Sequence, residues 1–162
     1  MLAIEKREKI ENVAIEILQN VDMLDKIPVD IIKIANSLGI KVYKCQFKEQ
    51  GISGAILKEN NEYKIYVKTD DAQVRKRFTV AHELGHFLLH KDKLEDEHYD
   101  DIMYRGNLSS DEEDEANYFA SCLLMNKEPL LKISKLVKNK SELARMFEVS
   151  EAAMNIRIGE LR

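Results

Sequence analysis

The sequence predicts an α+β fold, in which a short mixed sheet packs against a helix within one small domain and a helical segment follows at the C-terminus. Three observations lead to this prediction. Two helical patterns come first, three short stretches with strand-like alternation follow, and helical patterns fill the rest of the chain. A length of 162 residues suffices for one compact core with a small appendage. We therefore expect a domain over residues 1–130 and a C-terminal helical segment over residues 131–162 that packs on it.

The two N-terminal helices are predicted from apolar spacing and from the residues at their ends. The first is expected from about Ile4 to Asn20, because apolar side chains recur at helical spacing. The second is expected to carry Pro28 in its first turn, where the missing N–H has no partner to lose, and to continue through Leu38. Gly39 then suits the left-handed position that commonly follows a helix.

Three strands are predicted between residues 40 and 67. Residues 40–43 and 63–67 alternate in the manner of strands, and residues 55–57 precede an Asn-rich turn at 59–62 that suggests a hairpin. An edge strand of such a sheet could pair with an extended peptide by backbone hydrogen bonds. The alternative, that these strands only cover the core, stays open.

Residues 82–86 form an HExxH pattern, which places His82 and His86 on one face of a helix and Glu83 to the side. Both rings could reach one metal ion, and zinc suits neutral imidazole ligands at a site with three protein ligands and one open position. The apolar flanks at 78–81 and 87–89 predict a buried helix, where unpaired polar groups are costly. A solvated surface helix with a chance match explains these flanks less well.

A third ligand is expected from the acidic stretch that begins at residue 109. On a helix, Glu113 lies at one margin of the apolar stripe and is the inward carboxylate, whereas Glu112 lies near the other margin and is a weaker candidate. The remaining acids are expected on a solvated face; they are Asp111, Asp114 and Glu115.

The alternative role for these acids is helix capping. Ser110 with Glu113 and Ser109 with Glu112 both fit a capping box. With the HExxH pattern upstream, we expect Glu113 to bind metal and Ser109 to form the cap with Glu112. Asn117, one turn after Glu113, could orient a ligand by a hydrogen bond.

Further polar residues could assist the site. His90 follows His86 by four positions, and we interpret it as structural or peripheral, because its use as a ligand would displace His82. A hydrogen-bond donor is needed to stabilise an oxyanion at a peptide carbonyl. The candidates are His98, Tyr99, Tyr104 and Tyr118.

The tail over residues 141–158 predicts two short helices that are broken near Val149, with Ser150 as the N-cap of the second. This pattern is similar to a helix-turn-helix. The second helix offers a mixed set of charges, however, and no cluster of cations for phosphates: Glu151, Asn155, Arg157 and Glu160. We expect packing or partner recognition, and no direct binding of nucleic acid.

The composition predicts a cytoplasmic protein. The net charge of −4 provides no broad basic surface. Cys45 and Cys122 are far apart and form no CxxC motif, so they are expected to be reduced thiols, with Cys122 in the core. Charged residues interrupt the first ten positions, which excludes a secretory signal there, and no stretch is apolar enough to span a membrane.

Three segments together resemble the ImmA/IrrE family of zinc metallopeptidases, which occur in bacteria, phages and mobile elements. They are residues 77–87, residues 113–120 with 123–125, and the tail over 143–161. The resemblance implies a zincin-like domain of the gluzincin type, with one Zn²⁺ bound by His82, His86 and Glu113 and with Glu83 as the general base. One departure is that Asn126 stands where family members often carry proline after Leu-Leu-Met.

The resemblance also implies a function. Family members act as endopeptidases on a specific helix-turn-helix transcriptional repressor, and cleavage relieves repression in phages, mobile elements or stress responses. The alternative is a noncatalytic, metal-containing regulator that acts by protein or DNA contacts through its C-terminal helices. The intact Glu83 favours the peptidase, because a structural metal site needs no base at that position.

Overall fold

The computed structural model describes residues 2–94 and 108–162. Helix α1 spans Ile4–Asn20, as predicted, and buries one apolar face. Helix α2 spans only Ile31–Ser37, so the prediction that Pro28 lies in its first turn is wrong. The Ile27–Pro28 peptide is cis, and the Asp30 side chain accepts a hydrogen bond from the Lys33 N–H at 3.0 Å, which starts the helix at Ile31. Gly39, with φ of +78°, ends this region as expected.

The sheet has three strands, β1 (Lys41–Cys45), β2 (Gly54–Glu59) and β3 (Glu62–Lys68), in the order β1-β3-β2. Strand β1 pairs parallel with β3, and β2 pairs antiparallel with β3, which confirms a mixed sheet with a hairpin. Asn60 and Asn61 both have positive φ, at 50° and 65°. Two such residues form the type of tight turn whose twist matches that of the flanking strands.

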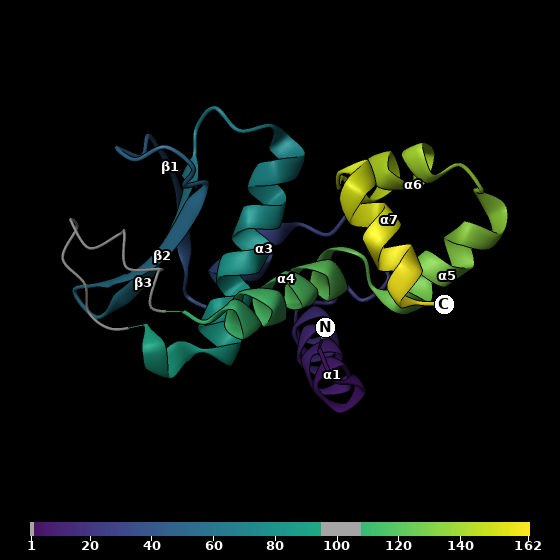
Figure 1. Ribbon diagram of the computed structural model, residues 1–162, viewed down its shortest axis with the longest axis horizontal. Coiled ribbons are helices and arrows are strands. Elements are labelled where there is room, and N and C mark those ends of the chain that lie inside the picture. The colour runs from purple at the N-terminus through teal and green to yellow at the C-terminus, as the bar shows by residue number, and fades with distance from the viewer. Residues whose placement is uncertain (1, 95–107) are drawn as a thin grey trace.

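Helices α3 (Gln73–Leu89) and α4 (Ser110–Leu124) form the centre of the molecule. Figure 1 shows α3 between the sheet and α4, and a 3₁₀ turn, η1 (Lys91–Lys93), follows α3. The two helices approach closely at Gly85, where an added Cβ would lie 3.1 Å from Ala116 Cα and 3.1 Å from Phe119 Cδ1. Glycine at this position therefore lets the HExxH segment lie directly against the acidic helix.

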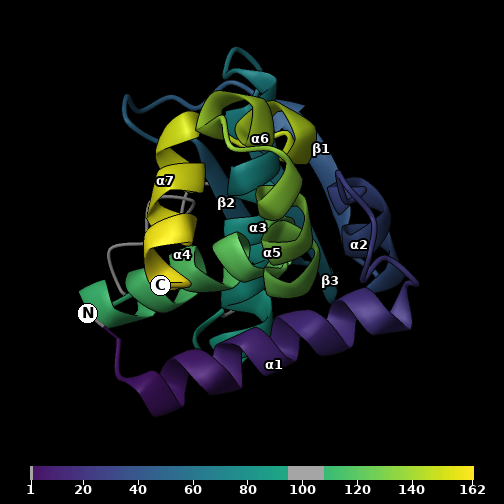
Figure 2. The ribbon, with the colours of Figure 1, turned by 90° about the vertical axis from the view of Figure 1, so that its right-hand side faces the viewer.

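Three helices complete the chain: α5 (Lys127–Leu136), α6 (Lys140–Phe147) and α7 (Glu151–Glu160). They lie at the end of the molecule opposite the sheet, and α1 runs beneath α4 (Figures 1 and 2). The two predicted tail helices are confirmed, and Ser150 accepts a hydrogen bond from the Ala153 N–H at 3.1 Å. Helix α5 was not predicted, and the boundary proposed after residue 130 falls inside it.

Arg157 attaches α7 to the rest of the protein. Its side chain is fully buried. Nε donates to the Met125 carbonyl at 3.0 Å, and Nη2 donates to Glu11 Oε1 at 2.8 Å. This cation therefore holds the C-terminal helices against α1 and the end of α4, and it is not available to a phosphate group.

Both cysteines are free thiols, and Cys122 is buried in the core as predicted. Burial raises the pKa of Cys122 to about 12, so the thiol stays protonated at neutral pH. Among the described residues, none of the helices has both the length and the apolar character needed to span a bilayer.

Candidate metal centre

Three candidate ligand side chains converge where α3 and α4 cross. Nε2 of His82 and Nε2 of His86 are 3.0 Å apart. Glu113 Oε2 lies 3.1 Å from the first nitrogen and Oε1 lies 3.0 Å from the second. Ligand atoms that share one tetrahedral zinc ion are roughly 3.4 Å apart, given bonds of about 2.1 Å. These three side chains therefore have the chemistry and the spacing to hold one such ion.

The electrostatics of Glu113 favour a metal ligand. Hydrogen bonds from His82 and then His86 hold the pKa of this carboxyl well below its usual range, although partial burial opposes them. The group is therefore ionised at neutral pH, and an ionised carboxylate is the form that binds a cation.

Glu112, the weaker candidate, is engaged in a helix cap. Its N–H donates to Ser109 Oγ at 3.2 Å, while its Oε1 accepts from the Ser109 N–H at 3.3 Å. Lys93 also donates to Oε1, and this bond, with those from Ser109, lowers the pKa of Glu112 to about 2 against the opposing effect of burial. Ser109 is the N-cap, as expected, which leaves Glu113 free of a capping role.

Asn117 lies beside the first histidine, where the sequence placed it. Its amide oxygen is 2.8 Å from His82 Nδ1. With an ion bound, a proton on Nδ1 would be donated to this oxygen and the lone pair of Nε2 would be directed at the ion, in place of the hydrogen bond to Glu113.

The interpretation of Glu115 as a solvated acid is wrong, while Asp111 and Asp114 are exposed as predicted. Glu115 is only 9% exposed, because α4 packs against α1 as well as α3 and so has two buried faces. Its Oε1 accepts a hydrogen bond from Lys6 Nζ at 2.6 Å, and Oε2 lies 2.8 Å from His90 Nε2. Burial raises the pKa of Glu115. Hydrogen bonds from Lys6 and His90 act in the opposite direction, and the pKa is lowered overall.

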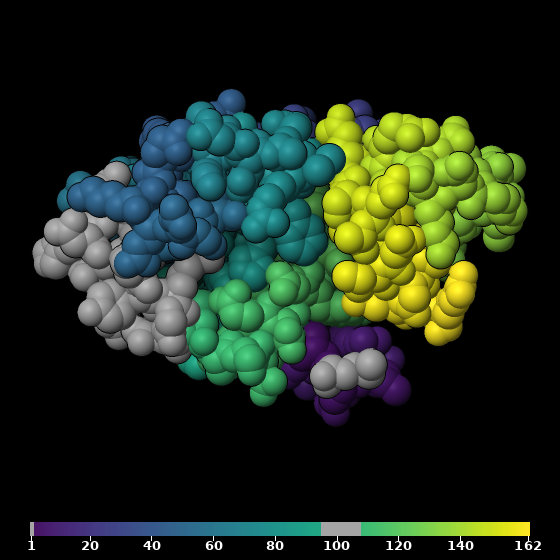
Figure 3. Space-filling view, turned by 45° about the horizontal axis from the view of Figure 1, so that its top comes forward, coloured from purple at the N-terminus to yellow at the C-terminus, as the bar shows by residue number. Residues whose placement is uncertain are grey.

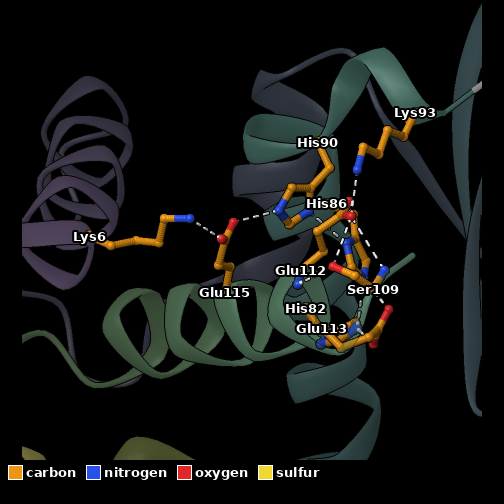
Figure 4. Close-up of polar contacts among 9 residues, drawn as sticks. All are labelled: Lys6, His82, His86, His90, Lys93, Ser109, Glu112, Glu113 and Glu115. Carbon is orange, nitrogen blue, oxygen red and sulfur yellow. Dashed lines mark hydrogen bonds and ion pairs between the residues drawn. The ribbon is translucent and has the colours of Figure 1, made fainter. Parts of the chain in front are cut away.

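His90 is buried and directly contacts a candidate ligand. Its Nδ1 lies 3.0 Å from His86 Nδ1, so the peripheral alternative is wrong (Figure 4). The spacing of four residues from His86 is a signal in the sequence for this contact. The involvement of Lys6 has no such signal, because 109 positions separate it from Glu115.

Glu83 and His82 border a cleft of about 910 Å³. Its walls come from α3, from the start of β2 at Gly54, from α4 and from α7, which contributes Ile156. Figure 3 shows the face on which the C-terminal helices meet the segments of α3 and α4. Glu83 is fully buried at this cleft and follows the candidate metal ligand His82 directly in the sequence.

Of the four candidate oxyanion donors, Tyr118 alone belongs to the described part of the chain. It borders the same cleft, and its ring lies 5.4 Å from the Arg7 guanidinium carbon. Burial is the main reason that the pKa of Tyr118 is raised to about 12, so its hydroxyl remains a donor at neutral pH. His98, Tyr99 and Tyr104 lie outside the described residues.

The domain is thus an α+β domain with a candidate metal site of two helical histidines and a carboxylate from a second helix. The chain belongs to the Peptidase M78 family, described as the IrrE N-terminal-like domain, whose model matches residues 35–159.

A solved structure with the same fold is named as a transcriptional regulator from Mycobacterium tuberculosis. The two superpose with a TM-score of 0.67 at 16% sequence identity, over 94% of this chain and 46% of that chain. This protein thus spans less than half the length of that regulator, and the likeness confirms the α+β fold. No curated protein matches the sequence.

Proposed function

We propose that the protein is a zinc-dependent endopeptidase that cleaves a specific helix-turn-helix transcriptional repressor and so relieves repression. The observation that carries the proposal is the position of Glu83, buried at a cleft of about 910 Å³ and one residue from a candidate metal ligand. A metal that only stabilised the fold would need neither this acid nor an open cleft. Membership of a peptidase family supports the same reaction class.

The residues of the cleft suit peptide hydrolysis. His82, His86 and Glu113 would hold the ion. When bound, zinc supplies polarisation of the peptide carbonyl and acidification of a water molecule. Glu83 accepts the proton of the attacking water and then delivers it to the departing amine.

Two further groups position the substrate in this proposal. Tyr118, which lines the cleft, remains one of four candidate donors to the developing oxyanion, with His98, Tyr99 and Tyr104 as the others. Strand β2 is at an edge of the sheet and begins at Gly54 in the cleft, so its backbone can pair with an extended peptide.

A repressor protein is proposed as the substrate in preference to DNA as a ligand. The net charge is −4, and the one arginine of α7 is buried against Glu11. Both facts disfavour phosphate binding by α7, the second of the two tail helices. The name of the solved relative, a transcriptional regulator, is compatible with a role in gene control in phages, mobile elements or stress responses. Such a role places the protein in the cytoplasm.

The test is to incubate the purified protein with the helix-turn-helix repressor encoded beside its gene. We expect cleavage at one site, loss of cleavage when a chelator removes the metal, and recovery when zinc is restored. Casein serves as the control and should remain intact. If the zinc-loaded protein binds the repressor and leaves it uncut, the noncatalytic regulator is the correct function; if it digests casein readily, the dedicated substrate is wrong.

A further inference from the structure

The two candidate histidine ligands differ in what their second ring nitrogen meets. His82 Nδ1 lies against the amide oxygen of Asn117, which is an exposed residue. His86 Nδ1 lies 3.0 Å from His90 Nδ1, and both of these rings are buried. The partner of this second nitrogen orients a metal-bound imidazole and sets its strength as a donor. The two ligands are therefore supported in different ways.

We propose that His90 and Glu115 are positioning residues that hold His86 toward the metal, and that Lys6 fixes Glu115 for this task. The chain of contacts is continuous, at 3.0 Å from His86 to His90, 2.8 Å from His90 to Glu115 and 2.6 Å from Glu115 to Lys6 (Figure 4). The inference rests on the metal site of the proposed function and is independent of peptide cleavage.

One arrangement of protons satisfies every contact in this chain. With Nε2 of His86 directed at the metal, its proton is on Nδ1 and is donated to Nδ1 of His90. His90 then carries its own proton on Nε2 and donates it to Glu115 Oε2. The other oxygen of Glu115 accepts from Lys6. Each buried polar atom of the chain has a partner, so the network is rigid and fixes the His86 ring.

The same contacts show that His90 does not replace either ligand. Its Nδ1 faces the side of His86 that is turned away from Glu113, whose contact is with Nε2 of that ring. Its Nε2 is taken by Glu115. Neither nitrogen of His90 is thus directed at the ion position, and the ring acts through His86.

Helix α4 provides a matched control. Glu112 and Glu115 lie one turn apart, both are 9% exposed, and each accepts a hydrogen bond from a lysine. Glu115 alone of these two contacts the histidine chain. If substitution of Glu115 lowers metal affinity and substitution of Glu112 does not, the loss is therefore due to the contacts with the histidines. It is not the general effect of removing a buried acid.

The experiment measures zinc affinity by competition with a chromophoric chelator, on full-length protein whose fold is checked by circular dichroism. We expect His90→Phe and Glu115→Gln to weaken zinc binding about 10- to 100-fold, the range typical of groups that support a ligand. Glu112→Gln should bind zinc nearly as the unchanged protein does. His90→Gln, whose amide oxygen can accept from His86, should recover part of the loss. Equal affinities for Glu115→Gln, His90→Phe and the unchanged protein would overturn the proposal.

A second measurement requires no substitution. In protein labelled with ¹⁵N at histidine, long-range ¹⁵N–¹H spectra distinguish the two tautomers of each ring. We expect His90 to be protonated at Nε2 and bare at Nδ1; a proton at Nδ1 of His90 would contradict the chain even if a variant failed to fold. If zinc affinity falls as expected but no repressor is cut, the positioning role stands and the peptidase proposal fails. If the unchanged protein binds no zinc, the positioning role is wrong.

Discussion

Glu113 is the charged member of the candidate ligand set, because both imidazoles bind a metal as neutral rings. Its carboxylate bridges His82 and His86, whereas Glu112 and Glu115 are held by other partners. We expect Glu113→Ala to reduce the zinc content far below one ion per chain, as measured by metal analysis of purified protein. One tightly bound ion in this variant would show that a different residue is the third ligand.

A substitution of Glu83 tests peptide cleavage separately from metal binding. Glu83→Gln preserves the shape of the side chain but removes its capacity to accept a proton. We expect the variant to keep its zinc and to cut the repressor about 10²- to 10⁴-fold more slowly. Asp111→Asn, at an exposed acid of α4, is the control and should cut at the normal rate. Cleavage by Glu83→Gln at the normal rate would exclude Glu83 as the base.

At the scale of single residues, the sequence predicts what depends on local geometry. The positions of His82, His86 and Glu113 follow from helical spacing and from one apolar stripe, and the structure brings these three together. The burial of Glu115 could not be predicted in this way. It depends on α1, which covers a second face of α4 and contributes Lys6.

The crossing of α3 and α4 depends on Gly85. In Gly85→Ala, the new Cβ would lie 3.1 Å from Ala116 Cα and 3.2 Å from its carbonyl oxygen, and this backbone can yield only if the helices separate. Such overpacking costs about 1–3 kcal/mol, and the better helix propensity of alanine offsets at most about 1 kcal/mol. We expect lower stability in urea unfolding and weaker zinc binding.

Gly159 provides the control for this prediction. It also lies within a helix, α7, but an added Cβ would meet nothing within 4 Å. Gly159→Ala should therefore leave zinc binding unchanged and stabilise the protein by up to about 1 kcal/mol. If Gly85→Ala proves equally stabilising, the close approach does not limit the site.

Helix ends and connections were harder to predict than helices. Helix α2 begins three residues after Pro28, because the Asp30 side chain provides the cap. Helix α5 was missed, although Pro129 in its first turn and the helical spacing of Leu130 and Ile133 are cues for it. Asn126, between α4 and α5, donates to the Leu24 carbonyl at 3.1 Å, a contact between distant parts of the chain that the sequence does not indicate.

At the scale of the whole molecule, residues of the HExxH helix and of the C-terminal helix α7 both line the cleft. Ile156 on α7 is 60% exposed and borders the cleft. We expect Ile156→Asp to slow cleavage of the repressor about tenfold or more through loss of apolar contact, while zinc content and stability persist.

Leu136→Asp is the matched control for this prediction. Leu136 is 83% exposed at the end of α5 and does not border the cleft. This variant should cut the repressor at the normal rate. Equal rates for both variants would show that α7 has no part in recognition, and equal losses would indicate a general effect of the added charge.

The region that matches the family begins at residue 35, whereas α1 ends at Asn20. A fragment trimmed to the matched region would therefore lose Lys6, which neutralises Glu115, and Glu11, which neutralises Arg157. It would also uncover the apolar side of α4 that α1 protects from water. The family model thus matches a shorter stretch of the chain than the structural likeness does, which covers 94% of it. We therefore expect a fragment over residues 35–159 to be less stable than the full chain, because α1 supplies the partners of Glu115 and Arg157.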